Sequence, residues 1–231
     1  MNQIFKNIVN LILFKFGYRI SRINNSHELF KLHKYKNYKE YKETQILYNL
    51  KKIDHVWADK FNLKKISIFL KKKFKKKIVN GICHGCRNGF EQKIFSKIIK
   101  KSNIIGTDIS TTATKYKNTI EWDFHIRNNK WKNFFDFVYS NSLDQSHNPK
   151  LALKVWLEQI KINGYIILEH AEQSGVIGQG KMDPFGVEAN FFPYLLADWF
   201  GHQISIKIIK SIKKNKMNSL VWIFFIKKIK N

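Results

Sequence analysis

Apolar and polar residues follow two different patterns along the chain. Residues 1–75 are rich in lysine, and segments near residues 3–16, 38–53 and 62–75 carry apolar residues at helix spacing. From residue 78 onward, short apolar runs alternate with helical patterns. The runs predict strands at residues 78–83, 103–107, 119–122, 134–140, 164–169, 203–212 and 219–229. The helical patterns predict helices near residues 89–101, 110–116, 149–161 and 189–200.

The order of these elements predicts the fold class. Strands that alternate with helices form a mostly parallel sheet with helices on both faces. The last two strands are joined by the short segment 213–218, and a short turn can join only antiparallel strands. The pattern therefore predicts an α/β, Rossmann-like sheet of seven strands that ends in an antiparallel hairpin. We expect a helical N-terminal extension over residues 1–75 and the main domain over residues 76–231.

Residues 78–108 carry the strongest functional signal. A β-type run leads into a turn with Gly85 and Gly89, a helical segment follows, and a second run ends at Asp108. Glycines let the backbone approach a ligand, and a helix N-terminus presents free N–H groups to an anion. A carboxylate about twenty residues after such a turn is placed for ribose hydroxyls. The alternative for Asp108 is a helix N-cap, although Ser110 is equally able to cap. This arrangement favours an enzyme that binds a nucleoside cofactor.

The net charge of +25 adds a second candidate partner, because strongly basic proteins often bind nucleic acid or anionic membranes. Nearly all the basic residues are lysines, however, and phosphate recognition favours the planar fork of arginine. Lys, Asn, Ile and Phe are all abundant, as translation of an AT-rich genome would give. We therefore favour compositional drift, with a functional polyanion surface as the alternative.

The two cysteines, Cys83 and Cys86, form no disulfide framework and suggest a reducing compartment, so we expect a cytoplasmic protein. Their C-x-x-C spacing would also suit a redox pair. A zinc site needs four good ligands and only His84 is nearby, so we predict no metal site. The apolar run at residues 8–16 is too short to span a bilayer. It is either a helix packed on the domain or a basic amphipathic helix on the inner membrane face.

Five stretches carry a resemblance to a known family: GICHGCRNGFEQ, IIGTDIS, TIEWDFH, FDFVYSNSLDQSHNP and NGYIILEH. In this order and spacing, the region of residues 76–229 resembles the class I S-adenosylmethionine-dependent methyltransferases. Within that class it looks most like the small-molecule "type 11" group, which includes polysaccharide-associated members.

The resemblance implies S-adenosylmethionine as cofactor and a site for each part of it. The glycine turn would lie beside the methionine part, Asp108 would hold the ribose diol, and Asp123 with Phe124 would meet the adenine. The end of the fourth strand would line the floor of the methyl-transfer site. The implied cofactor residues are His84, Gly85, Cys86, Arg87, Gly89, Asp108, Ile109, Asp123, Phe124, Asn141 and Ser142.

The chain departs from the family at two positions. Cys83 stands where an acidic residue usually contacts the cofactor's ammonium group, and Arg87 stands where a middle glycine is usual. Arg87 would then pair with the cofactor carboxylate or cover the site as a lid. The alternative is that these departures mark weakened or lost cofactor binding.

Methyl transfer to a hydroxyl is helped by a general base. The candidates are Asp144 and His147 after the fourth strand, and Glu169 and His170 after the fifth, because ligands lie beyond the carboxyl ends of strands in such sheets. We expect His147 as base and His170 as a substrate-orienting group. The glycine-dotted segment 172–190 and the N-terminal helices would form the acceptor pocket.

These observations predict a methyltransferase that acts on a small molecule, for which the family resemblance suggests a sugar or glycan precursor. Three alternatives remain: an RNA methyltransferase, a non-catalytic binding subunit with a degenerate Rossmann domain, and a redox protein. No Asn- or Asp-Pro-Pro-aromatic motif follows the fourth strand, which argues against a DNA base N-methylase.

Overall fold

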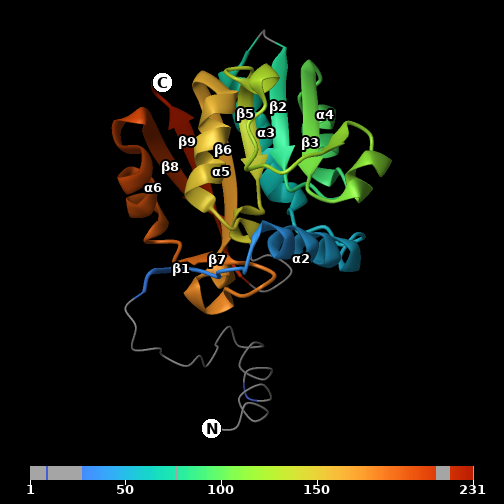
Figure 1. The fold of residues 1–231 in the computed structure, drawn as a ribbon. Helices are drawn as coiled ribbons and strands as arrows, with labels where there is room; N and C mark the ends of the chain where they lie inside the picture. The colour runs from blue at the N-terminus through green and yellow to red at the C-terminus, as the bar shows by residue number, and fades with distance from the viewer. Residues whose placement is uncertain (1–8, 10–27, 76–77, 212–218, 231) are drawn as a thin grey trace.

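The computed structural model of the chain describes residue 9 and residues 28–75, 78–211 and 219–230 (Figure 1). The turn expected over residues 213–218 and, apart from residue 9, the helix expected over residues 3–16 lie outside these residues. A seven-stranded sheet forms the centre, in the order β4-β3-β2-β5-β6-β9-β8. Its strands are β2 (Val79–His84), β3 (Ser102–Asp108), β4 (Thr119–Glu121), β5 (Phe135–Ser140), β6 (Ile160–Ala171), β8 (Ile204–Lys210) and β9 (Val221–Lys228).

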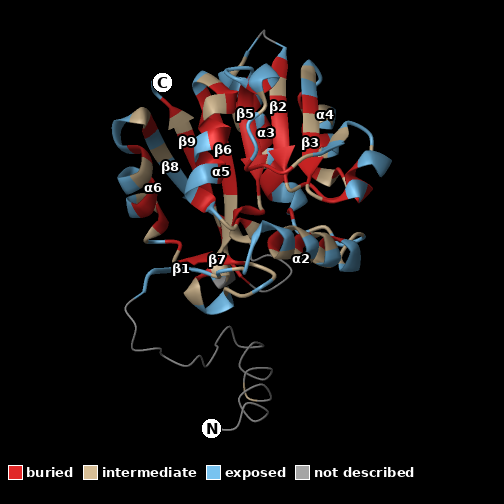
Figure 2. Cartoon of the chain, viewed as in Figure 1, coloured by how far each residue is buried: buried red, intermediate tan, exposed pale blue. Residues whose placement is uncertain are grey.

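The direction of the strands confirms the fold class predicted from the sequence. Strands β2 to β6 are parallel to one another, whereas β9 is antiparallel to both β6 and β8. The central strands β2 and β5 are buried at almost every position, which explains why their sequences are mostly apolar and do not alternate between apolar and polar residues (Figure 2).

Helices cover the two faces of the sheet. On one face, α3 (Lys60–Lys73) and α4 (Phe90–Ile98) pack with the sheet around Leu63, Ile66 and Phe95. On the other face, α5 (Pro149–Gln159) and α6 (Phe192–Phe200) pack around Trp156 and Leu196. Because α3 contributes fully buried leucine and isoleucine side chains to the core, this part of residues 1–75 is packed on the sheet.

The remaining elements lie at the edge where the parallel strands end (Figure 1). Helix α2 (Tyr38–Lys51) crosses this edge, and β1 (Phe30–Leu32) pairs antiparallel with β7 (Phe185–Val187) beside it. The sequence pattern did not predict β1 or β7, because each has only three residues. These elements cover the edge at which an α/β sheet binds ligands.

Two details differ from the sequence-based expectation. Residues 110–116 form only a short 3-10 helix, η1 (Thr111–Lys115), because Ser110 and two β-branched threonines start it and Tyr116 is already extended. Strand β6 is longer than predicted and begins at Ile160. No helix among the described residues is long and apolar enough to cross a membrane.

Candidate functional site

The glycine turn between β2 and α4 has the backbone shape expected of a ligand cradle. Gly85 has a φ of +67°, and a Cβ there would lie 2.6 Å from the Cβ of Ser142. Gly89 has a φ of +75° and begins α4 without a side-chain cap. Arg87 has a φ of +46° although it is not glycine. The turn therefore keeps a left-handed shape even where arginine replaces glycine, at a cost of roughly 1 kcal/mol or more.

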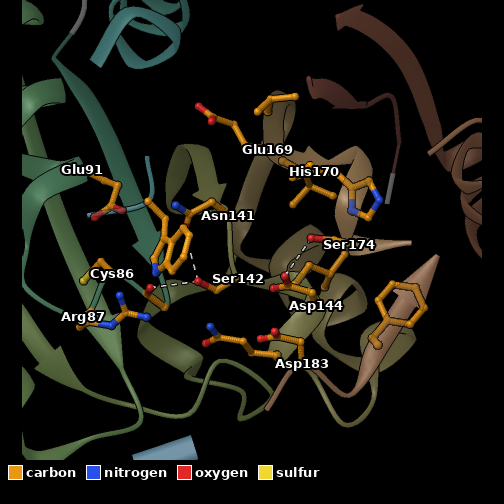
Figure 3. A pocket seen from close by; sticks show the side chains of 18 of the residues that line it. Cys86, Arg87, Glu91, Asn141, Ser142, Asp144, Glu169, His170, Ser174 and Asp183 are labelled. Carbon is orange, nitrogen blue, oxygen red and sulfur yellow. Dashed lines mark hydrogen bonds between the residues drawn. The ribbon is translucent and has the colours of Figure 1, made fainter. Parts of the chain in front are cut away.

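A cavity of about 240 Å³ opens beside this turn. Its wall is built from the turn itself, the loop after β5, the end of β6, the segment 174–185 and the α2–α3 loop. The turn contributes Gly85, Cys86 and Arg87, and the loop after β5 contributes Asn141 and Ser142. Five of the predicted cofactor residues therefore share one cavity (Figure 3).

Four carboxyl groups line the same cavity: Glu91, Asp144, Glu169 and Asp183. Burial raises the pKa of Glu91 to about 7 and that of Glu169 to about 8. Burial and the neighbouring Asp183 raise the pKa of Asp144 to about 8. In Figure 3, Asp144 and Asp183 lie together on the side opposite Glu91. A protein of net charge +25 thus concentrates acidic groups at this cavity.

Asp108 ends β3 at a second, much smaller space. This space has a volume of about 20 Å³, close to the roughly 10–15 Å³ that one water molecule needs. Asp108 accepts hydrogen bonds from Asn49 Nδ2 at 2.7 Å, from the Ser110 amide at 3.0 Å and from the Arg87 amide at 3.0 Å. Helix α2 therefore supplies a donor where a ribose would bind, and this part of the site is closed.

Asp123 lies at the same closed end, with Ile109 and Phe124 beside it. Its carboxylate accepts hydrogen bonds from the Tyr38 hydroxyl at 2.7 Å and from His125 Nδ1 at 2.6 Å. Burial alone would raise the pKa of Asp123, but the bonds and charge of His125 lower it to about 2. Asp123 is therefore ionised, and α2 contacts it through a second hydrogen bond.

The expected catalytic residues fall in different places. Asp144 and His170 line the main cavity, with Asp144 accepting a hydrogen bond from the Ser174 hydroxyl at 3.3 Å. His170 Nε2 donates to the Val187 carbonyl at 2.9 Å, and burial lowers its pKa to about 4. His147 lines neither space, because its ring packs 4.3 Å from the Tyr41 ring under α2.

Two predicted cofactor residues also lie outside both spaces. His84 is the last residue of β2 and its buried ring packs against Trp156 of α5, with its ring nitrogens 2.7 Å from the Thr107 hydroxyl and 2.8 Å from the Gln159 amide oxygen. Gly89 shapes the start of α4. These two residues flank the glycine turn at the end of β2 and the start of α4. Their contact with a cofactor stays a prediction.

Several site residues escaped the sequence analysis. Helix α2 buries Tyr41, Gln45 and Asn49 and leaves Leu47 and Leu50 about half exposed. The i, i+4, i+8 spacing of the buried polar residues was the available signal, but an apolar face was expected. Glu91 and Asp183 lie within stretches that the sequence analysis named, GICHGCRNGFEQ and segment 172–190, but neither was singled out as a site residue. Trp57 in the α2–α3 loop also lines the main cavity.

The cysteine pair lacks the features of a redox centre. Cys83 and Cys86 are both buried, and burial raises the pKa of both thiols. Reactive cysteines have a lowered pKa and partial exposure. In the described part of the chain, no three His, Cys, Asp or Glu side chains are grouped so that they could hold a metal ion.

The buried acids predict that stability falls as the pH rises from about 6.5 to 8. Glu91, Asp144 and Glu169 have folded pKa values above their ordinary ones, so the folded state binds more protons than the unfolded state up to pH 8. Below pH 6.5 this trend is opposed by histidines whose pKa burial lowers to about 4, namely His84, His147 and His170. The calorimetric melting temperature of the wild type should fall as the pH rises from 6.5 to 8, and that of Glu169→Gln should fall less. A melting temperature that stays constant or rises would contradict this assignment.

The comparisons with known proteins agree on the fold. No protein-family model and no curated protein matches the chain in sequence. Among solved structures, a 1,6-didemethyltoxoflavin-N1-methyltransferase from Burkholderia thailandensis, with 1,6-didemethyltoxoflavin and S-adenosylhomocysteine bound, superposes with a TM-score of 0.65 at 10% identity. That match covers 91% of this chain and 99% of the other.

Two further solved structures have the same fold. The plantazolicin methyltransferase BpumL, in complex with a triazolic desmethylPZN analog and S-adenosylhomocysteine, gives a TM-score of 0.61 at 16% identity over 82% of this chain and 98% of its own. A SAM-dependent methyltransferase from Aquifex aeolicus gives 0.51 at 13% identity over 73% of this chain and 98% of its own. The resemblance seen in the sequence is thus confirmed at the level of structure: the chain has the fold of the class I S-adenosylmethionine-dependent methyltransferases.

Proposed function

We propose that this chain is an S-adenosylmethionine-dependent methyltransferase that acts on a small molecule. The observation that carries the proposal is the placement of Asp108 at the end of β3, in direct hydrogen bond with the amide of Arg87 in the glycine turn. A carboxylate and a left-handed glycine turn on adjacent parallel strands are what a nucleoside cofactor needs at this edge. The fold shared with methyltransferases supports the same cofactor.

The residues present fit each part of this cofactor. Gly85 leaves room that a Cβ would fill, Asp108 would accept from the ribose diol, and Asp123 with Phe124 would meet the adenine. The 20 Å³ space excludes a nucleoside, so α2 must move away from Asp108 when the cofactor enters. When bound, S-adenosylmethionine supplies a methyl group already activated on a sulfonium. The chain's own task is then to align the acceptor and take up its proton.

Asp144 is the residue that we assign as general base. It lines the main cavity, and a pKa of about 8 is close to the working pH, which is where proton transfer is most efficient. His170 would orient the acceptor, since its Nε2 proton is held by the Val187 carbonyl and its Nδ1 is left as an acceptor. His147 is less well placed for either role, because it packs under α2 away from the cavity.

We further propose a polar acceptor of the sugar or glycan-precursor class. Trp57 and several carboxyl groups share the cavity wall, and an indole face with hydrogen-bonding groups suits a ring that carries hydroxyls. An RNA acceptor is favoured by the charge of +25. The acidic cavity disfavours it, because carboxylates repel phosphate groups close to the reacting atom.

A transfer assay separates these acceptors. The protein is mixed with S-adenosylmethionine labelled on its methyl group and with host-cell extract divided into RNA and small-molecule fractions. We expect label in the small-molecule fraction, and we expect Asp144→Asn to lower its rate at least about 100-fold, the usual scale for a general base. Label confined to RNA would overturn the small-molecule assignment. Label in neither fraction, with cofactor bound, would favour a binding subunit.

A further inference from the structure

In the wall of the main cavity, Glu91, Arg87, Asp144 and Glu169 each have a buried side-chain atom without a hydrogen-bond partner. Of these, only Glu91 and Arg87 are buried as whole residues, and their unpartnered atoms are Oε2 of Glu91 and Nε of Arg87. Glu91 is only 6% exposed and Arg87 only 9%. Both residues line the cavity from the same side, Arg87 from the glycine turn and Glu91 from the first turn of α4 (Figure 3). Leaving buried charged atoms unpaired costs free energy, which suggests that a ligand forms hydrogen bonds with them.

The two side chains do not complete each other. Among the described residues, no ion pair joins Arg87 to Glu91. The Arg87 guanidinium is instead anchored by Nη1, which donates to the His55 carbonyl at 3.2 Å. This bond crosses from the turn to the α2–α3 loop and holds the guanidinium over the cavity. The positive φ of Arg87 adds strain to the same position.

The surroundings of Glu91 contain mainly neutral or acidic groups. Among the described residues, Arg87 is the cation whose charge acts on its carboxyl group, and the Asn141 side chain lies beside it. The other titratable groups that face it are Cys83, Cys86, Asp108, Tyr139 and Glu169. Cys83 is the position where the family resemblance leads us to expect an acid. A carboxylate that is missing at position 83 is therefore present eight residues later, in the first turn of α4, where its charge acts on the buried Cys83 thiol.

We propose that Glu91 and Arg87 together bind the amino-acid end of the cofactor, with Glu91 accepting from its ammonium group and Arg87 Nε donating to its carboxylate. This inference rests on the proposed function. A zwitterion matches two unpaired atoms of opposite charge in one wall, and neither a simple anion nor a simple cation would satisfy both. It also gives a physical reason for arginine at a left-handed position, where glycine would relieve strain but supply no donor.

Two ligands that differ only at this end test the proposal. S-Adenosylhomocysteine carries the amino-acid group, whereas 5′-methylthioadenosine has the same nucleoside and sulfur without it. We expect Glu91→Gln to lower the affinity for S-adenosylhomocysteine about 10-fold, which is the effect of losing one charge-assisted hydrogen bond. The affinity for 5′-methylthioadenosine should stay within twofold of the wild-type value. Calorimetric titration measures both affinities. Glu158→Gln, on the exposed side of α5, is the matched control and should change neither.

The dependence of binding on pH gives a second readout. Because burial raises the pKa of free Glu91 to about 7, an ammonium group that binds the ionised form should displace its proton. Wild-type affinity for S-adenosylhomocysteine should therefore rise between pH 6 and 8, with proton release detectable in buffers of different ionisation enthalpy. Glu91→Gln should lose this dependence, and Glu91→Asp should keep part of it.

The outcomes separate this inference from the function beneath it. If both ligands bind the wild type and Glu91→Gln weakens them equally, or weakens neither, the zwitterion site is wrong while the cofactor assignment stands. If neither ligand binds the wild type, both proposals fail. Binding of 5′-methylthioadenosine by Glu91→Gln also demonstrates that the variant is folded, so a selective loss supports the proposal.

Discussion

Replacing Asp108 with asparagine is expected to weaken S-adenosylhomocysteine binding at least about 100-fold. The substitution removes the charge that would accept both ribose hydroxyls, and each charge-assisted hydrogen bond contributes about 1.5–3 kcal/mol. It keeps the size of the side chain and one acceptor oxygen, so one of the two hydrogen bonds from the Arg87 and Ser110 amides, which bind different oxygens of Asp108, can remain. Calorimetric titration of wild type and variant measures the loss.

The control for this experiment is Asp198→Asn, which alters an exposed aspartate on α6 away from the sheet edge. It should leave the affinity unchanged. Because burial raises the pKa of Asp108, the neutral asparagine should not unfold the protein. If the affinity of Asp108→Asn for S-adenosylhomocysteine stays within threefold of the wild-type value, Asp108 does not bind the cofactor.

The second large effect is expected when α2 is released from the two carboxylates. The double variant Tyr38→Phe, Asn49→Ala removes the hydrogen bonds from α2 to Asp123 and Asp108. At about 1.5 kcal/mol or more for each bond to a charged group, opening should become easier by a factor of about 100. We expect the association rate of S-adenosylhomocysteine to rise by that factor, as measured by stopped-flow tryptophan fluorescence.

The α2 experiment also identifies what α2 does after the cofactor has entered. If α2 of the wild type closes again over the bound cofactor, the double variant should also release the cofactor faster. Its affinity would then change less than its association rate. Leu47→Ala, on the exposed face of α2, is the control for a general loss of helix stability. An association rate that stays the same or falls in the double variant would show that α2 does not gate the site.

The main domain could be predicted from the sequence because its central strands are buried on both faces. Residues Phe135–Ser140 are mostly apolar and only six in number, a length that favours a strand over a helix, and the short final connection allows only an antiparallel pair. The glycine turn and Asp108 could be placed for the same reason, since each follows directly from the end of a predicted strand.

The rest of the site depends on contacts between segments far apart in the sequence. Asn49 meets Asp108 across 59 positions, and Tyr38 meets Asp123 across 85. No local pattern encodes such pairs, and the buried face of α2 is polar where helices normally bury apolar residues. His147 was favoured by side-chain type alone, whereas its position is set by packing on Tyr41.

Glu91 shows a third kind of limit. It is the second residue of α4, and a glutamate in the first turn of a helix is common because it interacts well with the helix dipole. Only its burial and its unpaired oxygen distinguish it from such a residue. The missing acid at Cys83 was visible in the sequence, but only the fold shows that Glu91 lies where it could replace that acid.

Titration of the wild-type protein with S-adenosylhomocysteine in a calorimeter tests the central claim most directly. The account predicts one site per chain with micromolar affinity, together with a melting temperature that rises with ligand concentration. The absence of both heat and stabilisation at millimolar ligand would contradict it. The chain would then have a methyltransferase fold without the cofactor, and its basic surface would become the feature to explain.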